Sequence, residues 1–150
     1  MRIGGFQKFS LLDYPGKMAA IIFTQGCNFR CGYCYNLSLM CPEHFNEPLD
    51  EKEILGFLEL RKGKLEGVVV TGGEPTIQLG LDDFLSKIKA MGYAIKLDTN
   101  GNRPDVLARL IESKLVDFIA MDIKTSLDRY EQAVGVSLDT QNIKKSIDLI

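Results

Sequence analysis

Short apolar segments alternate with longer amphipathic segments along most of this 150-residue chain. Four short segments, residues 18–24, 67–71, 93–98 and 116–122, are rich in β-branched, aliphatic and aromatic residues and predict strands. The second of them, Gly67 to Thr71, is apolar without alternation, which is typical of a parallel strand covered on both faces. The pattern therefore predicts a buried parallel sheet.

Apolar residues at helical spacing fill the intervals between these strands. The clearest helix is predicted from Leu81 to Met91, with apolar residues at i, i+3, i+4, i+7 and i+10 and with Gly92 ending it. Further helices are predicted over 50–60 with Asp50 as N-cap, over 104–111 opening on Pro104, over about 126–134, and from about Thr140 onward. Strand–helix alternation at this spacing predicts right-handed βαβ units and an α/β fold.

The last helical stripe, Ile143, Ile147 and Ile150, continues to the final residue without a cap or a following strand. Four parallel strands that curve as in a barrel would leave an open sheet edge. The sequence therefore predicts one domain over residues 1–150, the N-terminal part of a partial parallel (β/α) barrel cut after about four strands.

Composition and charge exclude several classes of function. The net charge is −2, and no Lys/Arg run is dense enough to favour nucleic acid. The longest apolar run, Met18 to Phe23, is too short to span a membrane, and the N-terminus does not have the long apolar core of a signal peptide. We therefore expect a cytoplasmic protein that binds neither nucleic acid nor membrane.

Three of the four cysteines lie within eight residues, which indicates metal or redox chemistry rather than a disulfide framework. Cys27, Cys31 and Cys34 follow the first predicted strand with the spacing C-x3-C-x2-C. Three thiolates on one loop suit three corners of a four-iron, four-sulfur cluster and leave one iron open to a ligand. A zinc site closed by Cys41 or by His44, the only histidine, is the alternative.

Polar groups follow the other three predicted strands as well. Because active sites of parallel α/β folds gather at the C-terminal ends of the strands, we expect these groups to share one rim with the cysteines. Taken singly, each is also compatible with a plain turn or a solvated surface. The residues concerned lie in Thr71-Gly72-Gly73-Glu74-Pro75-Thr76, Asp98-Thr99-Asn100-Gly101 and Asp122-Ile123-Lys124.

The chemistry of this rim predicts a ligand that carries an amine, a carboxylate and hydroxyl groups. Gly72 and Gly73 allow the backbone to approach such a ligand closely. The Glu74 carboxylate suits an ammonium group, whereas Asp98 and Asp122 offer acceptors for hydroxyl groups or a cation. The ammonium group of Lys124 offers a positive charge that suits a carboxylate of the ligand.

These motifs resemble those of the radical S-adenosylmethionine superfamily. The resemblance rests on Cys27-x3-Cys31-x-Tyr33-Cys34 and on Thr71-Gly72-Gly73-Glu74-Pro75. The segments 98–101 and 121–124 are similar to those of glycyl-radical-enzyme activases. Residues 12–17 and 24–28 look most like the activating proteins of anaerobic ribonucleoside-triphosphate reductase, and the pyruvate formate-lyase activating enzymes are close behind.

The resemblance implies a role for each matching residue. Cys27, Cys31 and Cys34 would ligate the cluster, whose open iron would be chelated by S-adenosylmethionine. The segment Gly72 to Glu74 would hold the methionine amine, and Tyr33, together with the backbone of Tyr35 and Asn36, would contact the adenine. Four residues would line the ribose and carboxylate side, where related activases also host a monovalent cation: Asp98, Thr99, Asp122 and Lys124.

The resemblance also implies a reaction and partners. Reductive cleavage of S-adenosylmethionine would give a 5′-deoxyadenosyl radical, which would take a hydrogen atom from a glycine of a partner, anaerobic ribonucleotide reductase. A flavodoxin or ferredoxin would supply the electron. A small-molecule substrate and a zinc-binding module remain alternatives. Cys41 is interpreted as a free or buried thiol and Arg30 as solvent-exposed.

Overall fold

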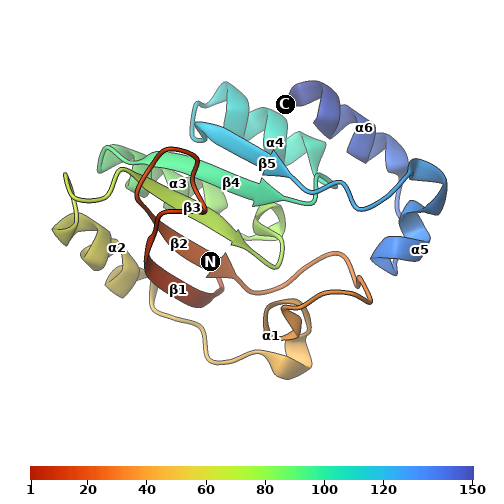
Figure 1. Ribbon diagram of the computed structural model, residues 1–150, viewed down its shortest axis with the longest axis horizontal. Helices are drawn as coiled ribbons and strands as arrows, with labels where there is room; N and C mark the ends of the chain where they lie inside the picture. The colour runs from red at the N-terminus through yellow and green to blue at the C-terminus, as the bar shows by residue number, and fades with distance from the viewer.

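The computed structural model describes all residues from 1 to 150 as a five-stranded sheet with helices packed on it. The strands are β1 (Ile3–Ser10), β2 (Ala19–Thr24), β3 (Gly67–Gly72), β4 (Ala94–Thr99) and β5 (Phe118–Met121), in the spatial order β1-β2-β3-β4-β5. The four strands from β2 to β5 are parallel, as predicted, and their arrowheads point to the same end in Figure 1.

The sequence pattern missed the first strand. β1 pairs with β2 in antiparallel fashion, so the sheet has five strands rather than four, and β1 and β5 are its edge strands. Two glycines obscure β1 in the sequence. Gly4 is needed because a Cβ there would lie 2.4 Å from the Gln25 side chain. Much of the rest of β1 is exposed, as is usual for an edge strand.

The predicted helices are present close to their expected positions. They are α2 (Glu51–Leu60), α3 (Leu81–Ala90), α4 (Pro104–Glu112), α5 (Tyr130–Val134) and α6 (Thr140–Leu149). The expected cap of α2 is confirmed, since the Asp50 side chain accepts a hydrogen bond from the backbone of Lys52 at 2.9 Å. The 3₁₀ turn η3 (Leu127–Arg129) and α5 together fill the helix predicted over about 126–134. Sequence reasoning did not predict α1 (Leu37–Met40) or the 3₁₀ turns η1 (Pro42–His44) and η2 (Pro75–Ile77).

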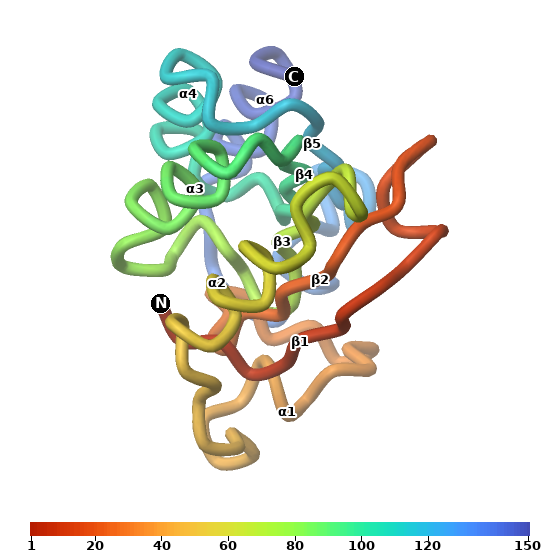
Figure 2. The backbone as a smooth tube through the Cα atoms, turned by 90° about the vertical axis from the view of Figure 1, so that its left-hand side faces the viewer, coloured from red at the N-terminus to blue at the C-terminus, as the bar shows by residue number.

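The main core lies between one face of the sheet and helices α2, α3 and α4. Figure 2 shows α3 and α4 on one side of the sheet and the β1–β2 connection extending on the other side. Eighteen buried residues form this core. The strands contribute Ile22, Val70, Ile95 and Leu97, among others, and α4 contributes Leu107, all of them fully buried. No helix of the structure has the length and apolar character needed to cross a membrane.

A second, smaller apolar cluster holds the cysteine loop in place. Phe29 from the loop packs against Tyr130 of α5, with ring centroids 6.4 Å apart, and Ile143 of α6 completes the contact. The backbone N–H of Arg30 donates to the carbonyl of Val134 at 2.7 Å. The C-terminal helices therefore support the loop that carries the predicted metal ligands.

Candidate functional site

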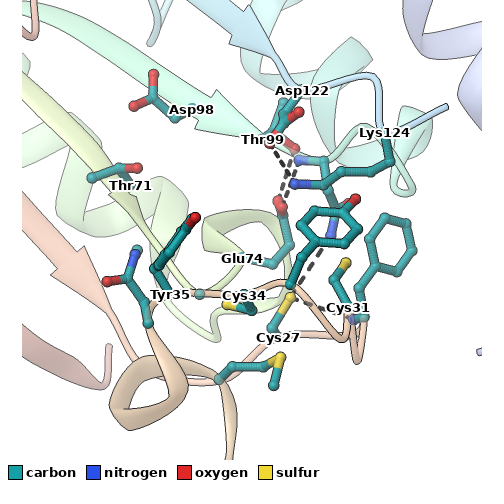
Figure 3. Close-up of a pocket in the computed structure, with 17 residues that line it drawn as sticks. Cys27, Cys31, Cys34, Tyr35, Thr71, Glu74, Asp98, Thr99, Asp122 and Lys124 are labelled. Atoms are coloured by element: carbon teal, nitrogen blue, oxygen red, sulfur yellow. Dashed lines mark hydrogen bonds and ion pairs between the residues drawn. The ribbon is translucent and has the colours of Figure 1, made fainter. Parts of the chain in front are cut away.

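A pocket of about 450 Å³ opens at the C-terminal ends of the parallel strands (Figure 3). All the site residues predicted from the sequence line it: Cys27, Cys31, Tyr33, Cys34, Tyr35, Asn36, Gly72, Gly73, Glu74, Asp98, Thr99, Asp122 and Lys124. Four further residues, Phe29, Met40, Thr71 and Asn100, complete the lining. Residues from four strand ends thus meet in one place, as the position of the motifs indicated.

The three cysteines lie on the loop that follows β2. Cys31 is buried, whereas Cys27 and Cys34 are partly exposed. The Cys27 sulfur accepts a hydrogen bond from the backbone N–H of Phe29 at 3.3 Å. Burial raises the pKa of the Cys27 thiol to about 11. A bound metal would take the place of this proton, because thiolates rather than thiols are metal ligands.

The three cysteines of the loop form a donor set that suits an iron–sulfur cluster. In an iron–sulfur cluster each cysteine binds its own iron, so three cysteines on one loop need not converge on one point. Cys41 is a half-buried free thiol, in line with its interpretation above, and His44 is exposed.

Arg30 is exposed, as expected, but it also contributes to the loop. Its guanidinium donates to the backbone carbonyls of Cys27 at 2.6 Å and Phe29 at 2.7 Å. These contacts stabilise the turn that separates the first two cysteines.

The two glycines of the segment after β3 are required by the cysteine loop itself. Gly72 has a φ of +109°, and a Cβ there would lie 2.4 Å from the backbone nitrogen of Thr24. A Cβ on Gly73 would lie 2.1 Å from the carbonyl oxygen of Gly26. The next residue, Glu74, donates its backbone N–H to that same oxygen at 2.8 Å. The segments that follow β2 and β3 are therefore in direct backbone contact.

The Glu74 carboxylate joins the ends of β3 and β4. It is 1% exposed and accepts hydrogen bonds from the Thr99 hydroxyl at 2.8 Å and from the backbone N–H of Asn100 at 2.7 Å. The backbone and hydroxyl of Thr76 also donate to it. Burial raises the pKa of Glu74, and these hydrogen bonds oppose the shift. Three of these hydrogen bonds go to Oε1 and one goes to Oε2, and Glu74 lines the pocket together with Gly72 and Gly73.

Two ion pairs lie at the pocket, near the ends of β4 and β5. Asp98 of β4 pairs with Lys96 of the same strand, whose side chain is almost completely buried. Asp122 pairs with Lys124 in the segment after β5. Although burial opposes it, this pair raises the pKa of Lys124. The carboxylates of Asp98 and Asp122 and the ammonium group of Lys124 therefore all line the pocket.

The three residues expected to contact adenine lie at the outer rim. Tyr33 is 52% exposed and Tyr35 99% exposed, and Asn36 is also exposed at the start of α1. All three residues line the pocket, where Tyr33 and the backbone of Tyr35 and Asn36 are the expected contacts.

Sequence reasoning missed two polar residues of this region, Asn100 and Lys96. Asn100 is 6% exposed and makes hydrogen bonds to three different loops. It was interpreted as part of an Asn-Gly turn, and no single-sequence signal indicates its long-range partners. Lys96 lies two residues before Asp98, and that spacing within a strand was the available signal that the two side chains share a face.

Known proteins have sequences similar to that of this chain. A glycyl-radical enzyme activating enzyme of Methanocaldococcus jannaschii is 36% identical over 97% of this chain and 59% of its own length. The pyruvate formate-lyase 1-activating enzyme of Escherichia coli is 33% identical over 91% of this chain and 57% of its own length. The chain thus spans less than two thirds of these relatives.

Solved structures and a family model agree with the fold described above. The structure of SuiB from Streptococcus suis bound to S-adenosylmethionine superposes with a TM-score of 0.59 at 20% identity, covering 86% of this chain and 31% of SuiB. The sequence model of the radical SAM superfamily matches residues 21–150, which include the cysteine loop and every strand end that lines the pocket. The chain therefore belongs to the radical SAM superfamily.

Proposed function

We propose that residues 1–150 form a radical SAM domain of a glycyl-radical-enzyme activating enzyme. Members of this superfamily use a four-iron, four-sulfur cluster and S-adenosylmethionine. The observation that carries the proposal is the single pocket that brings Cys27, Cys31 and Cys34 together with the ends of β3, β4 and β5. The similar activating enzymes from two organisms support the choice of reaction.

Each part of the pocket has a proposed role. The three cysteines hold the cluster, and the segment from Gly72 to Glu74 accepts the methionine amine. Tyr33, Tyr35 and Asn36 contact the adenine from the rim. The remaining polar residues bind the ribose and carboxylate of S-adenosylmethionine, and a monovalent cation where one is present: Asp98, Thr99, Asp122 and Lys124.

When bound, the cluster and S-adenosylmethionine supply a 5′-deoxyadenosyl radical that removes a hydrogen atom from a substrate. The chain's own residues orient the cofactor and keep it in place. Glu74 holds the ends of β3 and β4 at a fixed distance through its buried hydrogen bonds. Phe29, packed against Tyr130, keeps the cysteine loop against the C-terminal helices.

We propose a glycine Cα–H of a partner enzyme as the substrate, with anaerobic ribonucleotide reductase as the first candidate and pyruvate formate-lyase as the second. A flavodoxin or ferredoxin would supply the electron. A small-molecule substrate is the competing function, because a probable GTP 3′,8-cyclase of Pyrococcus horikoshii is 31% identical over 89% of this chain and 44% of its own length.

Anaerobic reconstitution followed by an assay for 5′-deoxyadenosine tests the proposal. The protein should form this product from S-adenosylmethionine and a chemical reductant. Cys31→Ala should form none, whereas Cys41→Ala, which removes a thiol outside the pocket lining, should retain the parent rate. Equal product from the parent protein and Cys31→Ala would show that the ligands are assigned wrongly.

Electron paramagnetic resonance then separates the candidate substrates. After addition of an inactive glycyl-radical enzyme, a glycyl-radical signal on that partner supports the activase. Product formation that is stimulated by a small molecule, without such a signal on either candidate partner, would favour the competing function.

A further inference from the structure

Asn100 connects three loops of the pocket from a buried position. Its backbone N–H donates to Glu74 at 2.7 Å. Its side-chain amide donates to the Asn28 side chain at 2.8 Å, and the same nitrogen lies 4.0 Å from the Cys27 sulfur. The residue is 6% exposed, so these contacts are shielded from water.

The orientation of the Asn100 amide is fixed by its neighbours. The backbone N–H of Asn102 donates to the Asn100 oxygen at 3.0 Å. A backbone N–H can only donate, so the oxygen must face Asn102 and the nitrogen must face the cysteine loop. One amide hydrogen is used by Asn28, and the second is available to the sulfur of Cys27.

A hydrogen bond to a cluster ligand has a predictable electrostatic effect. The cluster gains one negative charge when it accepts an electron from a one-electron reductant. A donor that points at a ligand sulfur favours the more negative, reduced form and raises the reduction potential, which is one of the ways a protein tunes such a cluster. Burial strengthens the effect because the local dielectric constant is low.

We propose that Asn100 is a positioning residue that donates a hydrogen bond to Cys27 and raises the reduction potential of the cluster. The inference rests on the proposed function, since it requires a cluster on Cys27. Asn100 does not bind the metal itself. It acts through the Cys27 sulfur and makes the one-electron reduction of the oxidised cluster easier for the electron donor.

The test compares two asparagine variants of the reconstituted protein. Asn100→Ala removes the donor to Cys27, whereas Asn28→Ala removes only the hydrogen bond between the two asparagines. The midpoint potential is measured by a redox titration followed by electron paramagnetic resonance, after iron and sulfide contents have been matched. We expect a lower potential for Asn100→Ala and a potential close to the parent value for Asn28→Ala.

An unchanged potential in a fully loaded Asn100→Ala variant would overturn the inference. Equal shifts in both variants would also overturn it, because they would show that the asparagine pair acts only by shaping the loop. A parent protein that takes up no iron and sulfide would instead refute the proposed function, and the inference with it. Iron content therefore distinguishes the two failures.

A measurement on the unsubstituted Asn100 decides the question if Asn100→Ala does not fold or load. Asparagine labelled with ¹⁵N in the side chain is incorporated into a double variant, Asn28→Ala with Asn36→Ala. The two substitutions remove the asparagine side chains of the cysteine loop and of the outer rim, while Asn100 keeps its labelled side chain. Electron–nuclear double resonance of the reduced cluster should detect a coupled side-chain nitrogen. The absence of this coupling in a loaded sample would contradict the proposal.

Discussion

The two faces of the parallel sheet have different compositions, although the same strands supply both. Ile22, Val70 and Leu97 point to the outer face and are fully buried under the helices. The inner face is the opposite face of the sheet, which carries the pocket. There, Ile21 and Val69 lie side by side and are apolar, whereas Asp98, nearer the C-terminal ends of the strands, is polar. The outer face stabilises the fold, and the inner face changes from packing to chemistry toward the C-terminal ends of the strands.

The inner face is closed at the opposite end by an aromatic ring. Tyr14, from the connection between β1 and β2, is 4% exposed and packs beside Ile21 and Val69. A Cβ on Gly67 would lie 2.8 Å from this ring. Apolar packing thus blocks one end of the inner face and leaves the other end, with its polar groups, as the site for a ligand.

The largest expected effect comes from a cavity on the outer face. Leu107→Ala removes a fully buried side chain of α4 and should lower the free energy of unfolding by about 2–5 kcal/mol. Leu79→Ala, at a position that is 92% exposed, should stay within about 0.5 kcal/mol of the parent protein. Urea unfolding measures both, and similar losses in the two variants would contradict the distinction between buried and exposed positions.

A smaller effect is expected from the polar end of the inner face. Thr99→Val keeps the shape of the side chain but removes a donor to the buried Glu74 and the acceptor for the N–H of Gly101. Leaving these groups unsatisfied should cost about 1–3 kcal/mol. The matched control is Thr140→Val at the start of α6, away from the pocket lining. Equal unfolding free energies in the two variants would show that the Glu74 network contributes little.

The smallest effect is expected at an ion pair on the edge of the helical layer. Glu51 pairs with the N-terminal ammonium at 3.3 Å and with Lys87 at 3.0 Å. Partial burial opposes the shift, but these partners lower the pKa of Glu51 below its ordinary value of 4.5. Its contribution to stability is therefore present above pH 4.5 and is lost as the pH falls through the lowered pKa.

Acid titration of stability measures this contribution. Glu51→Gln should cost less than about 1 kcal/mol at neutral pH, because the partners are partly exposed. The difference from the parent protein should shrink as the pH falls below 4.5. A difference that grows on acidification would mean that the pair does not stabilise the folded state.

The contrast between the faces also explains what the sequence predicted well. Positions buried on the outer face must be apolar. They therefore appear in the sequence as continuous apolar segments in the strands and as apolar residues at helical spacing in the helices. The four parallel strands and their helices were predicted for that reason. β1 was missed because Gly4 and Gly5 weaken the strand signal, and both are explained only by contacts with residues distant in sequence, the side chains of Gln25 and Phe23.

The site was predictable as a set of positions but not as a set of contacts. Parallel strands deliver their C-terminal residues to one rim, so the motifs alone brought the pocket residues together. Which groups bind each other depends on the spacing of neighbouring strands and on rotamers. The buried role of Glu74, the pairing of Lys96 with Asp98 and the contact of Asn100 with Cys27 therefore appear only in the structure.

The central claim is that the polar end of the inner face binds an iron–sulfur cluster and S-adenosylmethionine together. The most direct test is electron paramagnetic resonance of the reconstituted and reduced protein, with iron, sulfide and zinc contents determined on the same sample. We predict an iron–sulfur signal that changes when S-adenosylmethionine is added. Bound zinc without iron and sulfide, or a cluster signal that S-adenosylmethionine leaves unchanged, would contradict the account.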